Sequence, residues 1–349
     1  MSIRTVKGVG LATAVALAAA ACGGGGGGAG GDDEVFEFRV ADSYSVEHSI
    51  GKASIQPFME AVEERSEGRI KFEYFPDDSL VAAEDIPEAI ASGTADLGNL
   101  LYIGNLNPLL YVVQLPGLWG DSQTVEASEA FFEFAKTNEP TKQKFEELQT
   151  VPLFCLSTTT YQLEFAGRGV DTFDEVEGRE MRTAGVVLPH TIESIGAKPT
   201  DIAINEAYDA FNRGVIDSIT LSVPSVKAYA FAELIESAII NANLGGFPVC
   251  YGISQSRFDT LPKDLQNIMI EEGEKIVSEA ASQLISEVET DLQSWEEQGI
   301  ELYEIEDEAR AEAIQGVESS WIKQLEQEGV NGAAEAVEEW KTILDEHLG

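Results

Sequence analysis

The chain has 349 residues, and its 62 acidic and 22 basic side chains give a formal net charge of -40. This charge argues against nucleic-acid binding, because nothing in the chain would neutralise a row of phosphates. Hydrophobic residues make up 44% of the chain, which is enough for packed cores and excludes global disorder. Three cysteines are too few for a disulfide scaffold. The length fits one large domain or two of ordinary size.

Residues 1–21 have the pattern of an export signal. Arg4 and Lys7 supply positive charge, and residues 8–21 form an apolar run that is shorter than the roughly 20 residues needed to span a bilayer. The run ends at Cys22, as in a bacterial lipoprotein signal, although Ala19 stands where leucine is favoured. We therefore expect a lipoprotein with Cys22 as the lipidated residue. The alternative is ordinary secretion with cleavage after an Ala-x-Ala sequence.

A glycine-rich tether and a first α/β unit follow the signal. Residues 22–33 predict a flexible coil, so the folded body begins near residue 34. In the unit 34–150, apolar periodicity predicts strands at 35–41, 70–74 and 95–99 and helices at 50–66 and 84–92. Strands that alternate with helices indicate a parallel sheet, in which ligands bind at the carboxyl ends of the strands.

A second α/β unit is expected over residues 151–250. Its predicted strands are 151–157, 160–165, 180–183 and 215–221, and its predicted helices are 188–195 and 207–213. Residues 251–349 carry apolar stripes at helical spacing, so we expect C-terminal helices that brace both lobes. The predicted fold class is therefore α/β, a two-lobed periplasmic-binding-protein-like fold with a long C-terminal helical segment. A cleft between such lobes can close on a small ligand.

Five segments, in order, carry a resemblance to a known family. They are PFMEAVEERSEGRIKFEYFP (57–76), IPEAIASGTADLGNL (86–100), LPGLW (115–119), FDEVEGREMRT (173–183) and INEAYDAFNRGVIDS (204–218). Their order resembles the DctP-type solute-binding protein of TRAP transporters, the tripartite ATP-independent periplasmic systems. The resemblance covers about residues 34–300 and implies an extracytoplasmic solute receptor, not an enzyme.

The resemblance also implies where the ligand binds. In that family an arginine on a strand of the second lobe pairs with the substrate carboxylate, and Arg182 occupies the matching position. A guanidinium suits this role because its planar fork pairs bidentately with a carboxylate and keeps its charge when desolvated. Arg168 matches a second cationic position of some members. The alternative for Arg168 is a solvated turn residue between Gly167 and Gly169. The neighbours of Asp217 suggest a structural role at a strand end, and the alternative is that it touches the ligand or orders the cleft.

Six further ligand-binding candidates rest on position alone, and aromatic residues at such places are more often core than pocket. They are Tyr44, Asn99, Tyr102, Trp119, Ser222 and Phe247. The chain departs from the family pattern after Arg182, where Thr183-Ala184 replaces Val-Pro, and after Asp217, where the usual asparagine is absent. The resemblance therefore implies a carboxylate ligand without naming one.

Other chemistries do not assemble in the sequence. The three histidines are far apart and have no zinc-ligand spacing, and no phosphate or calcium loop is present, so we expect no metal and no cofactor. Ser45 and His48 lie close together, but no nucleophile elbow surrounds them. Cys155 and Cys250 lie on strand-like runs and are either disulfide-bonded or two buried thiols.

The sequence therefore predicts a lipid-anchored extracytoplasmic receptor. We expect it to bind a small organic acid in the cleft and to deliver it to the membrane subunits of a TRAP permease. The location is the outer face of the cell membrane, which is periplasmic where an outer membrane exists. Two alternatives remain: the solute-binding protein of an ATP-driven (ABC) importer, and a binding protein linked to a membrane sensor.

Overall fold

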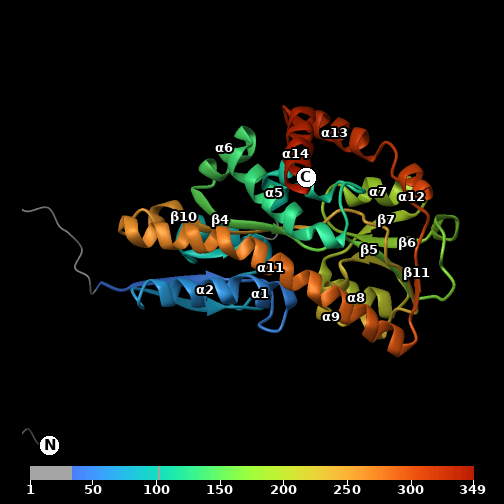
Figure 1. Ribbon diagram of the computed structural model, residues 1–349, viewed down its shortest axis with the longest axis horizontal. Coiled ribbons are helices and arrows are strands. Elements are labelled where there is room, and N and C mark those ends of the chain that lie inside the picture. Colours follow the sequence, from blue (N-terminus) through green and yellow to red (C-terminus); the bar gives the residue numbers. More distant parts are fainter. Residues whose placement is uncertain (1–33, 101–102) are drawn as a thin grey trace, which may run out of the picture. The chain divides into compact units, whose positions relative to one another are not determined.

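The computed structural model describes residues 34–100 and 103–349, and Figure 1 shows how their helices and strands are arranged. The expected signal, the tether with Cys22, and Tyr102 lie outside the described residues. Residues 35–349 form one unit. Within the described part of the chain, we find no helix with the length and apolar character needed to cross a membrane.

The first sheet has the strand order β2-β1-β3-β10-β4. Its strands are β1 (Phe36–Ala41), β2 (Ile70–Phe75), β3 (Leu97–Asn99), β4 (Thr150–Ser157) and β10 (Pro248–Ser254). The parallel pairing of β1 with β2 and β3 is as predicted, since alternating residues such as Phe38 and Val40 are buried. The sheet is mixed, however, because β10 runs antiparallel to both β3 and β4.

The second sheet has the strand order β11-β9-β5-β8-β6-β7. Its strands are β5 (Gln162–Phe165), β6 (Glu180–Thr183), β7 (Lys198–Asp201), β8 (Ser218–Leu221), β9 (Ser237–Ile239) and β11 (Glu301–Tyr303). Strands β6, β7 and β8 are parallel, whereas β5 runs antiparallel to β8 and β9. The two sheets are the centres of the two predicted lobes.

The chain passes between the sheets more often than the expected divisions at residues 150 and 250 imply. Strand β4, predicted within the second unit, and strand β10, which spans the expected end of that unit at residue 250, both pair in the first sheet, and β11 from the C-terminal segment pairs in the second. Both strands are short apolar runs, and such a run looks the same in either sheet. The crossings after β4 and before β10 therefore form the connection between the lobes.

The helices cover these sheets. In the first lobe they are α1 (Ser49–Ala53), α2 (Ile55–Arg65), α3 (Ile86–Ser92), α4 (Ile103–Leu106), α5 (Thr124–Thr137), α6 (Glu139–Glu147) and α10 (Gln255–Phe258), with short 3-10 turns η1 (Ala83–Asp85), η2 (Pro108–Gln114) and η3 (Asp121–Gln123). In the second lobe they are α7 (Leu188–Ser194), α8 (Ile204–Asn212) and α9 (Val223–Ala228), with η4 (Phe173–Val176) and η5 (Phe231–Glu233).

The helix predicted over 50–66 is two helices, α1 and α2, that meet at Ser54. Pro57 explains the break, because a proline has no N–H for the carbonyl four residues earlier and its ring clashes with that carbonyl. The backbone of Ser54 leaves the helical region, and its N–H and hydroxyl both donate to the carbonyl of Ile50, at 2.9 and 2.7 Å. The break lets α1 turn toward the second lobe, where it contacts α9.

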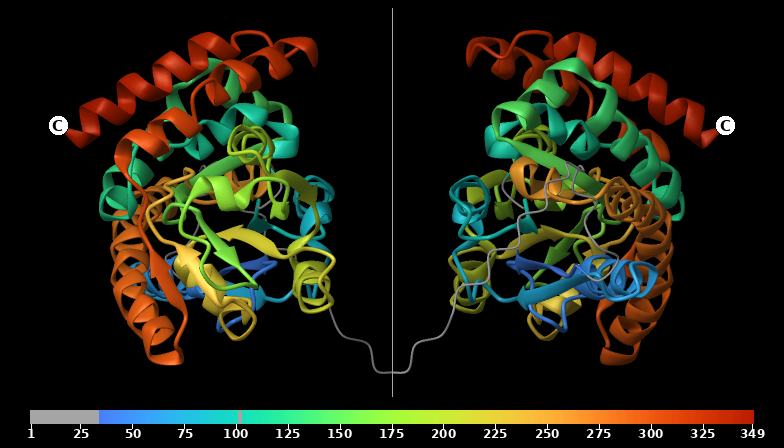
Figure 2. Two further views of the ribbon diagram at one scale, coloured as in Figure 1. Left: turned by 90° about the vertical axis from the view of Figure 1, so that its right-hand side faces the viewer. Right: turned by 90° about the vertical axis from the view of Figure 1, so that its left-hand side faces the viewer.

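The C-terminal helices are α11 (Lys263–Gln298), α12 (Asp307–Ala313), α13 (Val317–Gln327) and α14 (Ala333–Leu348). Figure 1 shows α11 running from beside α2 to beside α9, so that it contacts both lobes. Its first half accepts ion pairs from Arg65, and in its second half the buried Asp291 pairs with Lys227 of α9 at 2.6 Å. Helices α13 and α14 lie on the outside in Figure 2, with α14 against α5 and α13 against α7.

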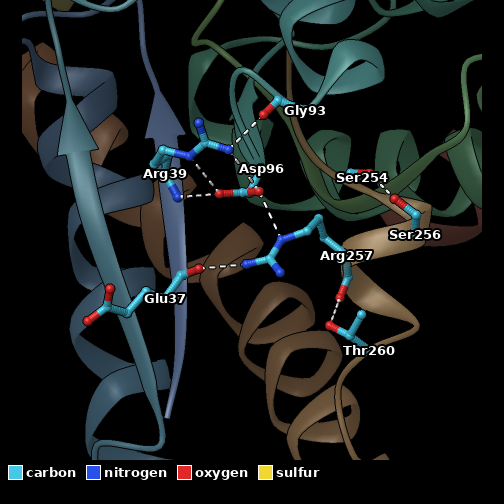
Figure 3. Close-up of polar contacts among 8 residues, drawn as sticks. All are labelled: Glu37, Arg39, Gly93, Asp96, Ser254, Ser256, Arg257 and Thr260. Atoms are coloured by element: carbon cyan, nitrogen blue, oxygen red, sulfur yellow. Dashed lines mark hydrogen bonds and ion pairs between the residues drawn. The ribbon is translucent and has the colours of Figure 1, made fainter.

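Two arginines converge on one buried carboxylate at the start of β3. Figure 3 shows Asp96 between Arg39 of β1 and Arg257 of α10, whose Nε atoms donate to it at 3.1 and 2.9 Å. The Nη2 atoms of the two arginines donate to the carbonyls of Gly93 and Glu37, both at 2.7 Å. This cluster fastens the amino end of β3 to β1 and α10, and both guanidinium groups serve structure there.

A disulfide joins Cys155 of β4 to Cys250 of β10. The two residues are directly opposite each other in the antiparallel pair, and both are fully buried. The bond therefore links the strand that leaves the first lobe to the strand that returns to it. The sequence left open whether these cysteines are disulfide-bonded or are two buried thiols, and the structure contains the disulfide.

We predict that the double variant Cys155→Ala/Cys250→Ala has a free energy of unfolding that is lower by about 2–4 kcal/mol, because the disulfide restricts the unfolded chain. Urea unfolding followed by circular dichroism measures this difference. A reducing agent should destabilise the unmodified protein by a similar amount and leave the variant unchanged. Equal stability of the unmodified protein with and without reductant would contradict the prediction.

Candidate functional site

A cavity lies where the two lobes and their connecting segments meet. Its lining residues come from three places: the first lobe (Tyr44 and Ile50), the connecting segments (Thr158, Tyr161 and Phe247) and the second lobe (Arg182, Ala184, Ile204, Leu221, Ser225 and Tyr229). The centres of water molecules can occupy about 50 Å³ of it. Because both lobes supply walls, a relative movement of the lobes would open or close the cavity.

Arg182 is the one charged side chain among the described residues that line the cavity. It lies on β6, one residue before the carboxyl end of the strand, and only 5% of its surface is exposed. Its Nε donates to the carbonyl of Ile202 at 3.0 Å, which fixes the direction of the guanidinium. Parallel strands β6 and β8 place their carboxyl ends together, and this edge faces the cavity through Arg182 and Leu221.

The connecting segments form a short antiparallel ladder beneath the cavity. Thr158 donates its N–H to the carbonyl of Phe247 at 3.1 Å, and Tyr161 donates to the carbonyl of Gly245 at 2.8 Å. Gly245 has a φ of +79°, and a Cβ there would lie 2.5 Å from the backbone of Gln114, so only glycine fits this close approach. The ladder brings the rings of Tyr161 and Phe247 into a stacked pair, 6.1 Å between centroids and 11° between planes.

Three aromatic rings meet across the lobes beside the cavity. His48 of the first lobe stacks on Tyr44 with centroids 4.3 Å apart, and its edge meets Tyr229 of the second lobe at 4.8 Å. The Nδ1 atom of His48 caps α1 by accepting the N–H of Ile50 at 3.2 Å. Its Nε2 atom is buried and has no hydrogen-bond partner in the described structure. Burial lowers the pKa of His48 to about 4, so the ring is neutral in this contact.

A buried carboxylate orients Tyr44 from behind. Asp42 follows β1 directly and accepts the N–H of Tyr44 at 3.0 Å in a short side-chain turn. Its other partners are the hydroxyls of Tyr74 and Tyr251 and the amide of Asn99, at 2.9, 3.0 and 3.1 Å. Burial raises the pKa of Asp42 to about 6, although these hydrogen bonds lower it. Asn99 therefore supports the wall through Asp42 and does not line the cavity.

Gln114, at the end of η2, joins the first lobe to the second. Its Nε2 donates to the carbonyl of Ala184 at 3.0 Å, and its Oε1 accepts the N–H groups of Val187 and Leu188, both at 3.2 Å. The side chain is fully buried. It thereby holds the segment that follows Arg182 against the first lobe.

The predicted site residues differ in how close they lie to the cavity. Arg182, Tyr44 and Phe247 line the cavity, as predicted. Trp119 and Ser222 are buried near it without lining it, and the hydroxyl of Ser222 bonds to that of the lining residue Ser225 at 2.8 Å. No signal in the sequence separated these buried neighbours from the wall itself.

Arg168 and Asp217 lie at the amino ends of the parallel strands of the second sheet, opposite the edge that faces the cavity, so the structure does not bring them to the cavity. Arg168 is exposed and pairs with Glu236 at 3.3 Å and Glu301 at 3.1 Å. Asp217 precedes β8 and pairs with Arg179 at 3.5 Å. The reason is strand direction: β5 runs antiparallel to β8, so the loop after β5 meets the amino ends of β6 and β8.

Sequence reasoning missed eight of the eleven lining residues, among them Tyr161 and Tyr229, and the bridging residue Gln114. Tyr161 belongs to a segment whose pairing with residues 244–247 is long-range, and Tyr229 ends a short helix with no family motif. Within the described residues, no group of three or more metal-ligating side chains occurs. The described cavity wall contains no histidine, cysteine, aspartate or glutamate.

Comparison with known families decides what kind of protein this is. Residues 40–328 match the model of the DctP family, described as bacterial extracellular solute-binding protein, family 7. The chain belongs to this family. The resemblance to TRAP solute-binding proteins is thereby confirmed, and the family consists of extracytoplasmic binding proteins, not enzymes.

Individual relatives of this family 7 protein are distant. A solute-binding protein from Sulfitobacter sp. is 24% identical over 242 residues, which cover 68% of this chain and 71% of the relative. A solved marine metagenome TRAP solute-binding protein, specific for aromatic acids and bound to 3-hydroxybenzoate, has a TM-score of 0.82 at 17% identity, covering 90% of this chain and 99% of that one. A Sulfitobacter sp. protein solved with β-D-galacturonate has a TM-score of 0.74 at 21% identity, covering 88% and 100%. These structures show that the two-lobed fold is shared.

We predict that ligand affinity falls by up to about thirtyfold between pH 7.5 and pH 5, because closure buries His48 as a neutral ring. When the lobes separate, the pKa of His48 returns toward 6.5. Below pH 6.5 the open form therefore binds a proton that the closed form excludes, and this favours the open form over the ligand-bound closed form. Calorimetric titration at a series of pH values measures the effect.

His48→Asn is the matched variant for this prediction, since asparagine also caps a helix but does not titrate. Its affinity should change little over the same pH range, and His190→Gln, remote from the cavity, should retain the original profile. A fall of equal size in the His48→Asn variant would assign the pH dependence to another group.

We also predict that Gln114→Leu weakens ligand binding by about tenfold or more. The closed form would then bury a carbonyl and two N–H groups without their partner, and each such group costs about 1–3 kcal/mol. Gln143→Leu is the control, since Gln143 bonds to Glu139 on the exposed face of α6. Unchanged affinity in Gln114→Leu would mean that this bridge does not depend on closure.

Proposed function

We propose that this receptor binds a small organic acid in the interlobe cavity and that Arg182 pairs with the ligand carboxylate. The observation that carries the proposal is the buried guanidinium, which is the one charged group in the described cavity wall. Charge-assisted hydrogen bonds between arginine and carboxylate are short, strong and frequently bidentate. Structures with this fold have been solved with 3-hydroxybenzoate and with β-D-galacturonate, both of which carry a carboxylate.

Closure around the ligand is the proposed mechanism. In the open form water solvates Arg182 and competes for its hydrogen bonds, whereas in the closed form the ligand replaces that water. A ligand that binds the closed form better shifts the population toward it. Gln114 and the contact between His48 and Tyr229 join the lobes only when they meet, so they add to the stability of the closed form.

Delivery to a membrane permease completes the proposed function. Family membership supports a TRAP-type permease as the partner that accepts the closed receptor. The sequence of residues 1–22 supports export and lipidation of Cys22, which would hold the receptor at the outer face of the membrane through the glycine-rich residues that follow.

We predict that Arg182→Gln reduces affinity for the bound acid at least about tenfold, since a hydrogen bond to a charged group contributes about 1.5–3 kcal/mol. A thermal-shift screen of small organic acids, neutral sugars and peptides finds the ligand, because a ligand that binds only the native state raises the melting temperature. Isothermal titration then measures the loss in the variant.

Arg168→Gln is the matched control, because it removes the same group from an exposed ion pair at the far edge of the sheet. It should bind as the unmodified protein does. Stabilisation by a neutral solute in both variants, with no effect of any acid, would overturn the carboxylate assignment and favour the receptor of another importer.

A further inference from the structure

The cavity wall is mostly apolar and aromatic. Of its eleven lining residues, four are aromatic (Tyr44, Tyr161, Tyr229 and Phe247) and four are aliphatic (Ile50, Ala184, Ile204 and Leu221). The two aliphatic hydroxyls are already engaged within the protein. Thr158 donates to the carbonyl of Thr159 and accepts the N–H of Phe247, at 2.8 and 2.9 Å, and Ser225 bonds to Ser222. Beside Arg182, the polar groups of the wall are then the hydroxyls of its three tyrosines, and most of the surface is apolar or aromatic, which suits a ring better than a ligand that carries many hydroxyl groups.

The charge of the wall fits one carboxylate. Arg182 is its one charged side chain, and the described residues supply no second cation for a dicarboxylate. Glu164, which lies behind Leu221, is fully buried, and burial raises its pKa well above the usual value, which favours the neutral carboxyl. A second ligand carboxylate would be buried without a partner, and burying an unpaired charge is strongly unfavourable.

The size of the cavity limits the ligand further. The centres of water molecules occupy about 50 Å³, which corresponds to about four waters, or about 120 Å³ of liquid. This is the size of one ring with a carboxylate attached. A hexuronate, with its ring and its additional hydroxyl groups, exceeds this space in the closed form.

The aromatic walls are held rigidly by their neighbours. Tyr161 and Phe247 stack on each other, and Tyr111 meets Phe247 edge-on with centroids 5.9 Å apart. On the other side, His48 stacks behind Tyr44 and meets Tyr229. Fixed aromatic faces favour an aromatic ligand over an aliphatic one of equal size, because ring pairs gain from edge-to-face and offset-stacked contacts as well as from burial.

From these four observations we propose that the ligand is a small aromatic monocarboxylate, in which a single ring bears one carboxylate directly or through one carbon. The inference rests on the proposed function, since Arg182 binds the carboxylate. The rings of Tyr44, Tyr161, Tyr229 and Phe247 select the aromatic body. Sugar acids, dicarboxylates and aliphatic acids are the alternatives that the experiment separates.

The experiment compares probe acids that differ in one property each, by isothermal titration with the full chain solubilised in detergent. Benzoate is the reference, cyclohexanecarboxylate removes aromaticity, glucuronate adds hydroxyls, succinate adds a carboxylate and benzamide removes the charge. We expect benzoate to bind at least tenfold more tightly than cyclohexanecarboxylate and at least a hundredfold more tightly than glucuronate or succinate. Benzamide should bind at least a hundredfold more weakly as well.

Variants separate this inference from the proposed function. In Phe247→Leu the ratio of benzoate to cyclohexanecarboxylate affinity should fall below threefold, while both acids still bind. In Arg182→Gln both acids should weaken together and their ratio should persist. Circular dichroism and urea unfolding confirm that each variant is folded, and Arg168→Gln, which lies outside the cavity, should retain the preference for benzoate.

The outcomes that overturn the inference are distinct. Tighter binding of glucuronate, succinate or cyclohexanecarboxylate than of benzoate, with loss in Arg182→Gln, would refute the aromatic class and leave the carboxylate receptor standing. Binding of benzamide as tight as that of benzoate would refute the role of Arg182 itself. Failure of every acid to bind would overturn both proposals.

Discussion

The structure depends on one electrostatic constraint, which is that a guanidinium has to remain charged where the lobes shut out water. A buried charge is costly unless a partner of opposite charge and further hydrogen bonds compensate it. Arg182 has part of that compensation from the carbonyl of Ile202. In the proposed function, a carboxylate gains more from Arg182 in the closed cavity than in the open cleft, and this difference allows the ligand to drive closure.

The rest of the fold confines the motion to a few residues. Two features stiffen the first sheet. The disulfide between Cys155 and Cys250 joins the strands that lead to and from the second lobe, and the cluster around Asp96 fixes the start of β3. The long helix α11 is attached to the first lobe near Arg65 and to the second through Asp291. In the proposed mechanism, the lobes move relative to each other at the segments after β4 and before β10, which also form the floor of the cavity. The same residues then serve both closure and ligand contact.

How far the sequence predicts this site depends on whether the relevant contact is local. The order of strands and helices from β1 to β3 follows from local periodicity, and Arg182 follows from a local motif. The assignment of β4 and β10 to the first sheet does not, because their pairing joins residues about a hundred positions apart. The sequence did not predict Tyr161 and Gln114 for the same reason, since both act through contacts with segments that are distant in the chain. Arg168 was a plausible candidate only while the direction of β5 was unknown, since its reversal sends the following loop to the opposite edge of the sheet.

The net charge of -40 and the proposed binding of an anion are compatible because they act over different distances. Salt at physiological concentration screens exposed charges over about 8 Å, so the acidic surface exerts little force on a ligand inside the cavity. Inside, the field is set by the few groups that lack solvent, and among these Asp42 and Glu164 have pKa values raised by burial. Burial thus makes these two carboxyls harder to ionise, whereas the guanidinium of Arg182 resists deprotonation. In the proposed function, the desolvation that makes the closed form costly for a charged His48 also strengthens the pairing of a ligand carboxylate with Arg182.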